Sequence, residues 1–300
     1  MFVNAEAASP MSAHVILDGK AIAENMKREL REELAHLKGH PQLRILYFDT
    51  PASIVYKNAQ VHVARDLGIW TDRTQTDGTY CFPWKTATQH DVEQLIQKWN
   101  RDRFVHGIFV HQPVPPQIDP QRISGLIDPH KDVEGIHPLN SARRFFAKSR
   151  IGSCTALAVM ELIEATGVAL EGKDAVVVGH SEIVGRPVSM LLLDKLATTT
   201  ICHIGTDRAG RLEEHVRRAD VLVVAVGKPQ VIKGAWVKPG SIVIDVGINV
   251  VGKQVVGDVE FEAAKARAGF ISPVPGGVGP VTVMMVMKNT LEAFKLQQAG

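Results

Sequence analysis

The stretch DAVVVGHSEIVGRP, residues 174 to 187, decides the fold class of this chain. Its apolar start is typical of a short strand buried on both faces of a sheet. Gly179 and Gly185 then bracket a turn, and a helix is expected to begin near Arg186 and Pro187. A buried strand that turns directly into a helix predicts a βαβ unit, and therefore an α/β domain with a parallel sheet.

The same turn is a candidate ligand site. Backbone N–H groups at a helix N-terminus suit the pyrophosphate of a dinucleotide. The pattern departs from the usual GxGxxG, so a plain strand-to-helix turn stays open as an alternative. In a site specific for NAD we expect an acidic residue where the next strand ends. That strand ends ICHIGTDR, with His203 at the position and Asp207 later, which favours NADP over NAD.

Basic residues around this turn could meet the 2′-phosphate of NADP. They are His180, Arg186, Arg208 and Arg211. For at least two of the arginines an ordinary solvated helix face remains the competing interpretation.

Strand and helix patterns alternate along the rest of the chain. The predicted strands are 43–48, 105–110, 174–179, 198–204, 220–227 and 241–247. Helical spacing of apolar residues predicts helices over 22–37, 92–99 and 155–166, and a final helix through Val281 and Phe294. The segment 141–152 is the expected crossing between two domains. At 300 residues and 45% hydrophobic, the chain is long enough for two such α/β domains.

Charge and cysteine content narrow the class of protein. The 34 basic residues nearly balance the 32 acidic ones and form no block, so we expect a small-molecule ligand and no nucleic acid. The cysteines Cys81, Cys154 and Cys202 show no metal-ligand spacing, which predicts no metal site and a reducing compartment. The leader MFVNAEAASPMS lacks signal-peptide features, and no apolar run reaches the ~18 residues of a membrane span. We therefore expect a cytoplasmic protein with no membrane partner, with Met1 and Met11 both open as the start.

Several long motifs, in order, carry a family resemblance. They are LDGKAIAENMKREL, PAS with Tyr56 and a following GI, VHGIFV, KDVEGIHPLN, AVVVGHSEIVGRP, KPGSIVIDVGIN, VVGDV and PVPGGVGPVTVMM. On these the chain resembles the methylenetetrahydrofolate dehydrogenase/methenyltetrahydrofolate cyclohydrolase family over nearly its full length. The resemblance implies a folate-binding catalytic α/β domain over 1–150 with the C-terminal helix 280–300, and a Rossmann-type NAD(P) domain over 151–279. It also implies a homodimer and a tetrahydrofolate one-carbon derivative as substrate.

Two reactions follow from the resemblance. In the first, a hydride moves from the methylene bridge of 5,10-methylenetetrahydrofolate to the nicotinamide, which needs contact more than acid–base chemistry. In the second, the methenyl cation is hydrolysed, so water must be activated. The family assigns that work to a lysine four residues after the tyrosine, supported by a glutamine after the VHGIxV strand and the second aspartate of KDVDG.

This chain departs from the family at each of those positions. The lysine position is Gln60, because the spacing from Tyr56 onward matches without a gap. His111 replaces the glutamine and is followed by Gln112, and Glu134 replaces the aspartate. Phe48 stands where the family has a glycine, and we expect it to alter the wall of the same cleft. Lys57 would project about 100° away from Tyr56 on a helix, so it is not expected to substitute for the lysine.

Three accounts of these departures stay open. In the first, the cyclohydrolase is lost, because a glutamine amide cannot exchange a proton near neutral pH. In the second, Gln60, His111 and Glu134 form a rewired site with His111 as the proton carrier. In the third, the protein has a changed substrate or is a folate- or nucleotide-binding pseudoenzyme.

The resemblance and the residues together give the predicted sites. The catalytic set is Tyr56, Gln60, His111 and Glu134. The substrate-binding set is Phe48, Ser53, Tyr56, Gln112, Glu134, Pro275, Gly276, Gly277 and Thr282. The cofactor-binding set is Gly179, His180, Ser181, Ile183, Gly185, Arg186, Pro187, His203, Val226, Gly227, Ile248 and Gly276. The predicted activity is an NADP-preferring dehydrogenase, with NAD possible and the cyclohydrolase lost or strongly reduced.

Overall fold

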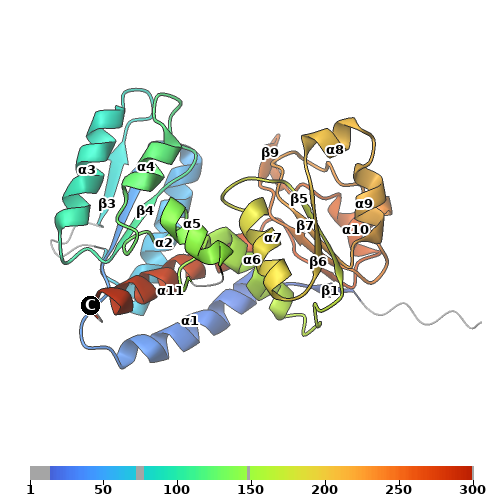
Figure 1. The fold of residues 1–300 in the computed structure, drawn as a ribbon, viewed down its shortest axis with the longest axis horizontal. Helices are drawn as coiled ribbons and strands as arrows, with labels where there is room; N and C mark the ends of the chain where they lie inside the picture. The colour runs from blue at the N-terminus through green and yellow to red at the C-terminus, as the bar shows by residue number, and fades with distance from the viewer. Residues whose placement is uncertain (1–13, 72–77, 147–148, 299–300) are drawn as a thin grey trace, which may run out of the picture.

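The computed structural model describes residues 14–71, 78–146 and 149–298. Two α/β lobes lie side by side, and the helices α1 (Gly19–Ala35) and α11 (Val278–Gln298) run between and beneath them (Figure 1). The leader residues 1–12, with the choice between Met1 and Met11, lie outside the described residues.

The first lobe is built on a parallel three-stranded sheet in the order β3-β2-β4. The strands are β2 (Leu43–Phe48), β3 (Thr79–Phe82) and β4 (Gly107–Val110). The helices are α2 (Pro51–Leu67), α3 (Gln89–Arg101), α4 (Pro120–Leu126) and α5 (Pro138–Phe145). Alternate residues of β2 face opposite sides of the sheet. Ile45 joins the apolar cluster that includes residues of α2, and Leu46 joins the one that includes residues of α3.

The second lobe is built on a parallel six-stranded sheet in the order β1-β11-β8-β7-β5-β6. Its strands are β1 (Val15–Ile16), β5 (Asp174–Val178), β6 (Thr198–Cys202), β7 (Val221–Val224), β8 (Ile242–Asp245) and β11 (Phe270–Ile271). The helices α6 (Cys154–Glu164) and α7 (Gly185–Asp194) cover one face. The other face carries α9 (Leu212–Arg218) and α10 (Phe261–Lys265). The remaining elements are α8 (Ile204–Arg208), a 3₁₀ turn (Gly234–Trp236) and the hairpin β9 (Asn249–Val251) and β10 (Gln254–Val256).

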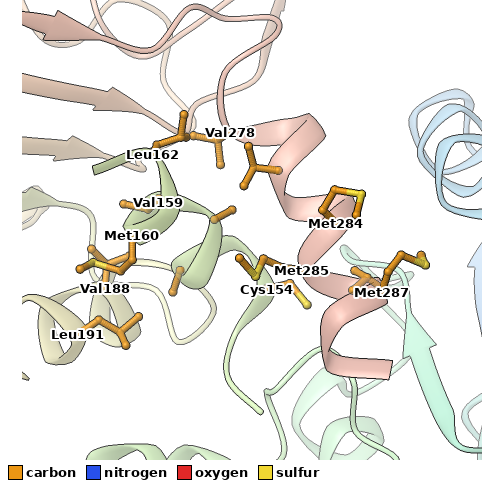
Figure 2. Packing of buried hydrophobic residues seen from close by; sticks show 14 of the residues in the cluster. Cys154, Val159, Met160, Leu162, Val188, Leu191, Val278, Met284, Met285 and Met287 are labelled. Carbon is orange, nitrogen blue, oxygen red and sulfur yellow. The ribbon is translucent and has the colours of Figure 1, made fainter. Parts of the chain in front are cut away.

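The helices α1 (Gly19–Ala35) and α11 (Val278–Gln298) join the lobes. α11 packs against α6, α1 and α2, so it contacts both lobes. Figure 2 shows side chains of α6 and α11 in one buried cluster, with Cys154 near Met285. Residues of both lobes therefore share one apolar cluster.

The observed helices and strands agree closely with the predicted ones. All six predicted strands and the predicted helices are present, with ends shifted by a few residues. The domain division at 150/151 and 279/280 stays a prediction, with one observed difference. The strand Val15–Ile16, predicted in the first domain, belongs to the sheet of the second lobe, where it pairs with Phe270–Ile271. Parallel hydrogen bonds to β11 supply the partners that its backbone N–H and C=O groups need. No helix in the described ranges is long and apolar enough to cross a membrane.

Candidate active site

The helix α2 carries the centre of the predicted catalytic set. Thr50 caps its N-terminus by accepting a hydrogen bond from the Ser53 backbone N–H, and Gly68 ends it in the left-handed region at φ 71°. The buried side chains of α2 recur at helical spacing and define one face of the helix. This face includes Ser53, Lys57, Gln60, Val61, Ala64 and Leu67.

Gln60 meets His111 at this face. His111 follows β4 directly, and its backbone N–H donates to the Leu46 carbonyl at 2.8 Å, which continues the ladder between β4 and β2. Its Nε2 lies 2.8 Å from Oε1 of Gln60. Gln60 is 0% exposed and His111 is 2% exposed, so the pair is screened from water. The structure therefore brings together two of the positions that depart from the family pattern.

Aromatic rings surround His111. The ring centroids of Tyr56 and Phe109 lie 5.3 Å and 5.5 Å from the His111 centroid. The Tyr47 centroid lies 6.1 Å from it, and the Lys57 ammonium sits 5.3 Å from the centre of the Tyr47 ring. Burial lowers the pKa of His111 from 6.5 to about 4, and the Lys57 charge adds to the effect.

Two sequence-based expectations change here. As a proton carrier His111 is expected to titrate near neutrality, but with a pKa of about 4 it is neutral at that pH. Lys57 is expected to project away from Tyr56 and not to take part in the site, yet it is 9% exposed and its charge acts on His111. The spacing from Lys57 to Gln60 is three residues, which places both on one helix face. This (i, i+3) spacing between Lys57 and Gln60 is the sequence signal that Lys57 faces the site. The spacing between Lys57 and Tyr56 does not show it.

Glu134 lies in the loop between α4 and α5. Asp132 fixes this loop by accepting hydrogen bonds from the backbone N–H groups of Gly135, Ile136 and His137. Burial raises the pKa of the Glu134 carboxyl well above its ordinary value, and the nearby Asp132 charge adds to it. Burial also raises the pKa of Tyr56, with contributions from Cys154 and Glu134. Tyr56 and Glu134 therefore share one electrostatic environment, as expected for members of one site.

Asn289 of α11 is a positioning residue that the sequence did not reveal. Its amide donates to the carbonyls of Val133 and Gly152 at 2.9 Å and 2.8 Å. A third contact reaches Sγ of Cys154 at 3.3 Å. The C-terminal helix thus fixes the residue before Glu134, although the two are more than a hundred residues apart.

Two predicted site residues behave differently from expectation. Phe48 is 0% exposed and packs edge-on against Trp84 in the cluster on the α3 side of the sheet. It does not form part of the Gln60 pocket wall, because its neighbour Tyr47 points to that side and strand side chains alternate. The Thr282 hydroxyl donates to the Val278 carbonyl within its own helix at 3.0 Å.

The loop before α11 brings the remaining predicted substrate residues to the joint between the lobes. A Cβ on Gly19 would lie 1.7 Å from the carbonyl oxygen of Gly277, so the start of α1 touches this loop directly. Gly276 has φ 107°, which favours glycine. Contact of Pro275, Gly276 and Gly277 with a ligand stays a prediction, as it does for Ser53 and Gln112.

A second site lies at the carboxyl ends of β5, β6 and β7. A cavity of about 280 Å³ is lined there by predicted residues Gly179, His180, Ser181, His203 and Val226. A Cβ on Gly179 would lie 2.2 Å from the Ala225 carbonyl, and one on Gly185 would lie 2.1 Å from the Gly179 carbonyl. Both glycines are therefore needed for the strand ends and the start of α7 to pack closely.

Asp258 shapes the far wall of this cavity. Its carboxylate is fully buried and accepts backbone hydrogen bonds from Val226, Gly227 and Lys228 at 2.7 to 2.9 Å. Lys228, Ala225, Ile204, Asp207, Leu212 and Val231 line the cavity without having been predicted. A glycine-lined cavity at the carboxyl ends of parallel strands fits a dinucleotide.

Some predicted cofactor residues do not line the cavity. They are Ile183, Gly185, Arg186, Pro187, Gly227, Ile248 and Gly276. Arg186 and Arg211 pair with glutamates on their own helical segments, at 3.5 Å to Glu182 and 3.4 Å to Glu214. Arg208 is also absent from the lining. The solvated-face interpretation of these arginines stays open beside the predicted phosphate contact, and the basic side chains that line the cavity are Lys228, His180 and His203.

The fold and the two sites define a two-domain α/β protein with a nucleotide-binding parallel sheet. Family models identify the lobes: residues 17–134 match the tetrahydrofolate dehydrogenase/cyclohydrolase catalytic domain, and residues 153–298 match its NAD(P)-binding domain. The chain belongs to the tetrahydrofolate dehydrogenase/cyclohydrolase family.

Individual relatives agree with this assignment. The bifunctional protein FolD of Geotalea daltonii is 46% identical over 285 residues, covering 93% of this chain and 98% of the relative. A silkworm (Bombyx mori) methylenetetrahydrofolate dehydrogenase superposes with TM-score 0.88 at 37% identity, covering 96% and 100% of the two chains. The Trypanosoma brucei enzyme, in a complex with NADP and an inhibitor, gives TM-score 0.88 at 36% identity, covering 96% and 99%.

Proposed function

We propose that this chain oxidises 5,10-methylenetetrahydrofolate to 5,10-methenyltetrahydrofolate with NADP as hydride acceptor, and that its cyclohydrolase activity is lost or strongly reduced. The observation that carries the proposal is the buried Gln60–His111 contact at 2.8 Å, where the family has a lysine and a glutamine. NADP, when bound, supplies the hydride acceptor.

The chain's own part in the oxidation is to hold and shield the substrate. Tyr56 and Glu134 are placed to position the pterin, and the loop at Gly276 and Gly277 to close the joint between the lobes. None of these roles requires a proton to move at the reacting carbon. The departures at Gln60 and His111 therefore leave the oxidation possible.

Hydrolysis of the methenyl cation requires a group that takes up and returns protons near neutral pH. The amide of Gln60 does not titrate there. His111, with its pKa lowered to about 4, is a weak base and is not in its protonated, acidic form near neutral pH. Neither side chain replaces the family lysine.

Lys57 gives a specific reason to keep a bifunctional alternative. Its ammonium is buried beside Tyr47 and close enough to His111 to affect its charge. In this second candidate, Lys57 is the proton carrier of a rewired site with Gln60, His111 and Glu134. Lys57→Met would then abolish hydrolysis and spare the oxidation.

The cofactor preference is part of the proposal. Lys228, His180 and His203 around the cavity support binding of the extra phosphate of NADP. The NADP complex of the Trypanosoma brucei relative supports the same preference. Asp207 lines the same cavity, and its negative charge opposes binding of the extra phosphate of NADP. NAD therefore stays open as the cofactor. A homodimer, a cytoplasmic location and the absence of nucleic-acid partners stay predictions from the sequence.

The test assays both half-reactions of the purified protein. We expect cofactor reduction with methylenetetrahydrofolate, faster with NADP than with NAD, and hydrolysis of the methenyl compound no faster than the solution background. If the unchanged protein hydrolyses the methenyl compound and the Lys57→Met variant does not, the result favours the bifunctional candidate. Folate binding without any cofactor reduction would contradict the dehydrogenase and indicate a binding protein or a changed substrate.

A further inference from the structure

The side chain of Asp258 joins two segments of the second lobe, only one of which lines the cofactor cavity. Its oxygens accept hydrogen bonds from the three backbone N–H groups of the loop 226–228, called the cofactor loop below, at 2.7 to 2.9 Å. Oδ1 also accepts from the side-chain amide of Asn249 in β9, at 2.8 Å. One buried carboxylate therefore holds both the cofactor loop and the base of the hairpin β9–β10.

The amide of Asn249 acts as a donor in this contact. Its Nδ2 lies 2.8 Å from Oδ1 of Asp258 and 3.4 Å from the carbonyl oxygen of Val256, the residue that faces Asn249 across the hairpin. A carboxylate and a backbone carbonyl only accept hydrogen bonds, so the NH₂ group of Asn249 is the end that points toward them. Hydrogen bonds to a carboxylate are stronger than those between neutral groups.

The surroundings of Asp258 fix its main chain and leave the rotation of its carboxylate to be set. The buried carboxylate of Asp245 accepts from the backbone N–H groups of Asp258 and Val259 at 3.0 and 2.8 Å, which holds this segment in place. A Cβ on Gly247 would lie 2.2 Å from Oδ1 of Asp258, so only a glycine leaves room for the carboxylate. Asn249 is then the side chain that holds Oδ1, and with it the plane of the carboxylate that faces the cofactor loop.

The rest of the hairpin is weakly attached. Val250, Val251 and Val255 are exposed. Among the residues that the structure describes, no other side chain of the hairpin 249–256 makes a hydrogen bond or an ion pair with the body of the lobe. Asn249 is therefore the contact through which the hairpin and the cofactor loop can affect each other.

We propose that Asn249 is a positioning residue for the cofactor: it orients the Asp258 carboxylate that fixes the cofactor loop, and it thereby couples the hairpin to the occupancy of the cavity. The coupling is reciprocal, because a cofactor that stabilises the loop also stabilises the contact between Asn249 and Asp258. The hairpin is then more rigid when a cofactor is bound. This inference rests on the binding of a nicotinamide cofactor in the cavity, which is part of the proposed function, and adds a residue that supports the site without lining it.

The first measurement is NADPH affinity, by fluorescence titration at about pH 8. Asn249→Ala removes the donor and should weaken binding about fivefold. Asn249→Asp keeps the shape of the side chain but sets a second carboxylate against Asp258, so it should weaken binding more than the alanine does. A side chain that only fills space would give the opposite order, because aspartate is the closer match to asparagine in shape.

The matched control is Lys253→Ala, which removes an exposed side chain from the turn of the same hairpin. This variant should bind NADPH as the unchanged protein does. In turnover assays Asn249→Ala should raise the KM for NADP and leave kcat and the KM for the folate nearly unchanged, because Asn249 orients a binding loop. Unchanged affinity in Asn249→Ala, or tighter binding by Asn249→Asp than by Asn249→Ala, would overturn the proposal.

The second measurement is backbone hydrogen exchange, followed by mass spectrometry. In the unchanged protein NADP should slow exchange in the hairpin 249–256, which does not line the cavity, as well as in the cofactor loop. In Asn249→Ala the hairpin should lose this protection. Without ligand, the cofactor loop should exchange faster in Asn249→Ala than in the unchanged protein or in Lys253→Ala. Hairpin exchange that does not respond to NADP in the unchanged protein would refute the coupling.

The proposed function and the role of Asn249 fail in different ways. If the unchanged protein binds neither NADP nor NAD, the proposed function fails, while exchange of the ligand-free cofactor loop in Asn249→Ala still decides the role of Asn249. If the unchanged protein binds NADP and Asn249→Ala binds it equally well, only the role of Asn249 fails. Thermal melting checks that Asn249→Ala is folded, and if it is not, the response of the hairpin to NADP in the unchanged protein decides.

Discussion

Nε2 of His111 lies 2.8 Å from Oε1 of Gln60, with both side chains buried between α2 and the end of β4. This contact joins two positions that are 51 residues apart in sequence. Each side chain supplies a buried polar partner to the other, so the two positions form one coupled contact.

Gln60→Lys alone should not restore full hydrolysis of the methenyl compound. A lysine there would place a second ammonium near Lys57 and next to a histidine in place of the family glutamine, so its pKa and orientation would differ from those in relatives. We expect less than about a tenth of the rate of the triple variant that adds His111→Gln and Glu134→Asp. Stopped-flow hydrolysis rates of both variants make the comparison, with oxidation assayed as the control for folding. Full recovery in the single variant would refute the coupling.

Stability should fall in mild acid because of His111. Its pKa in the folded protein, about 4, is below the ordinary 6.5, so the unfolded chain takes up the proton first. Its contribution is fully present above pH 6.5 and is lost as the pH falls toward 4, which amounts to about 2 kcal/mol between pH 6.5 and 5. His106, also lowered to about 4, adds in the same direction. Asp245, raised to about 6, acts oppositely, because the folded protein holds its proton more tightly.

Urea unfolding of the unchanged protein and of His111→Asn at pH 5 and pH 7 measures this effect. The variant should lose less stability between the two pH values. Equal pH dependence in both proteins would show that His111 is not the responsible group.

Gly179→Ala should weaken cofactor binding by more than tenfold and destabilise the protein by about 1–3 kcal/mol. Its φ is 122°, and a Cβ would lie 2.2 Å from the Ala225 carbonyl at the cavity wall. Gly125→Ala in α4 is the control, because a Cβ there meets nothing within 4 Å. Fluorescence titration with NADPH and thermal melts compare the two, and matching behaviour would contradict the close packing.

Asp258→Asn should loosen the loop 226–228 that forms the far wall of the cavity. An amide oxygen can replace one carboxylate oxygen but not both, so at least one of these part-buried backbone N–H groups loses its acceptor, at a cost of about 0.5–1.5 kcal/mol. Cofactor affinity should fall about tenfold, with folate affinity unchanged. Isothermal titration with each ligand separates these effects, and Glu171→Gln, an exposed carboxylate, is the control. Equal losses for both ligands would indicate general destabilisation instead.

Lys228→Met should weaken NADP binding about fivefold and NAD binding little, because Lys228 lines the cavity and its charge would act on the extra phosphate. Asp207→Asn should have the opposite sign and strengthen NADP binding. Dissociation constants for both cofactors at low and high salt make the test, since the Lys228 contribution should shrink with salt. An unchanged NADP/NAD ratio in both variants would place the phosphate elsewhere.

Local sequence was enough to predict most of the secondary structure. Apolar runs such as 174–178 and periodic helices such as α3 specify their conformation through burial on a fixed period, which neighbouring residues alone display. Short elements were missed for the same reason. The strands β1 and β11 have two residues each, and β1 exists only through pairing with β11, more than two hundred residues away.

The sequence by itself determined the family, because the family resemblance is carried by contiguous motifs. It also predicted a glycine turn for the nucleotide and a departure from the family pattern at Gln60, because both lie within such motifs. The tertiary structure alone decided what those residues do together. It placed Phe48 in the core and left Arg186, Arg208 and Arg211 outside the lining of the cavity at the ends of β5, β6 and β7. It also lowered the pKa of His111 and placed the Lys57 ammonium over the Tyr47 ring. The physical reason is that burial, side-chain direction and electrostatic environment depend on neighbours distant in sequence, and only the packed chain brings those neighbours within reach.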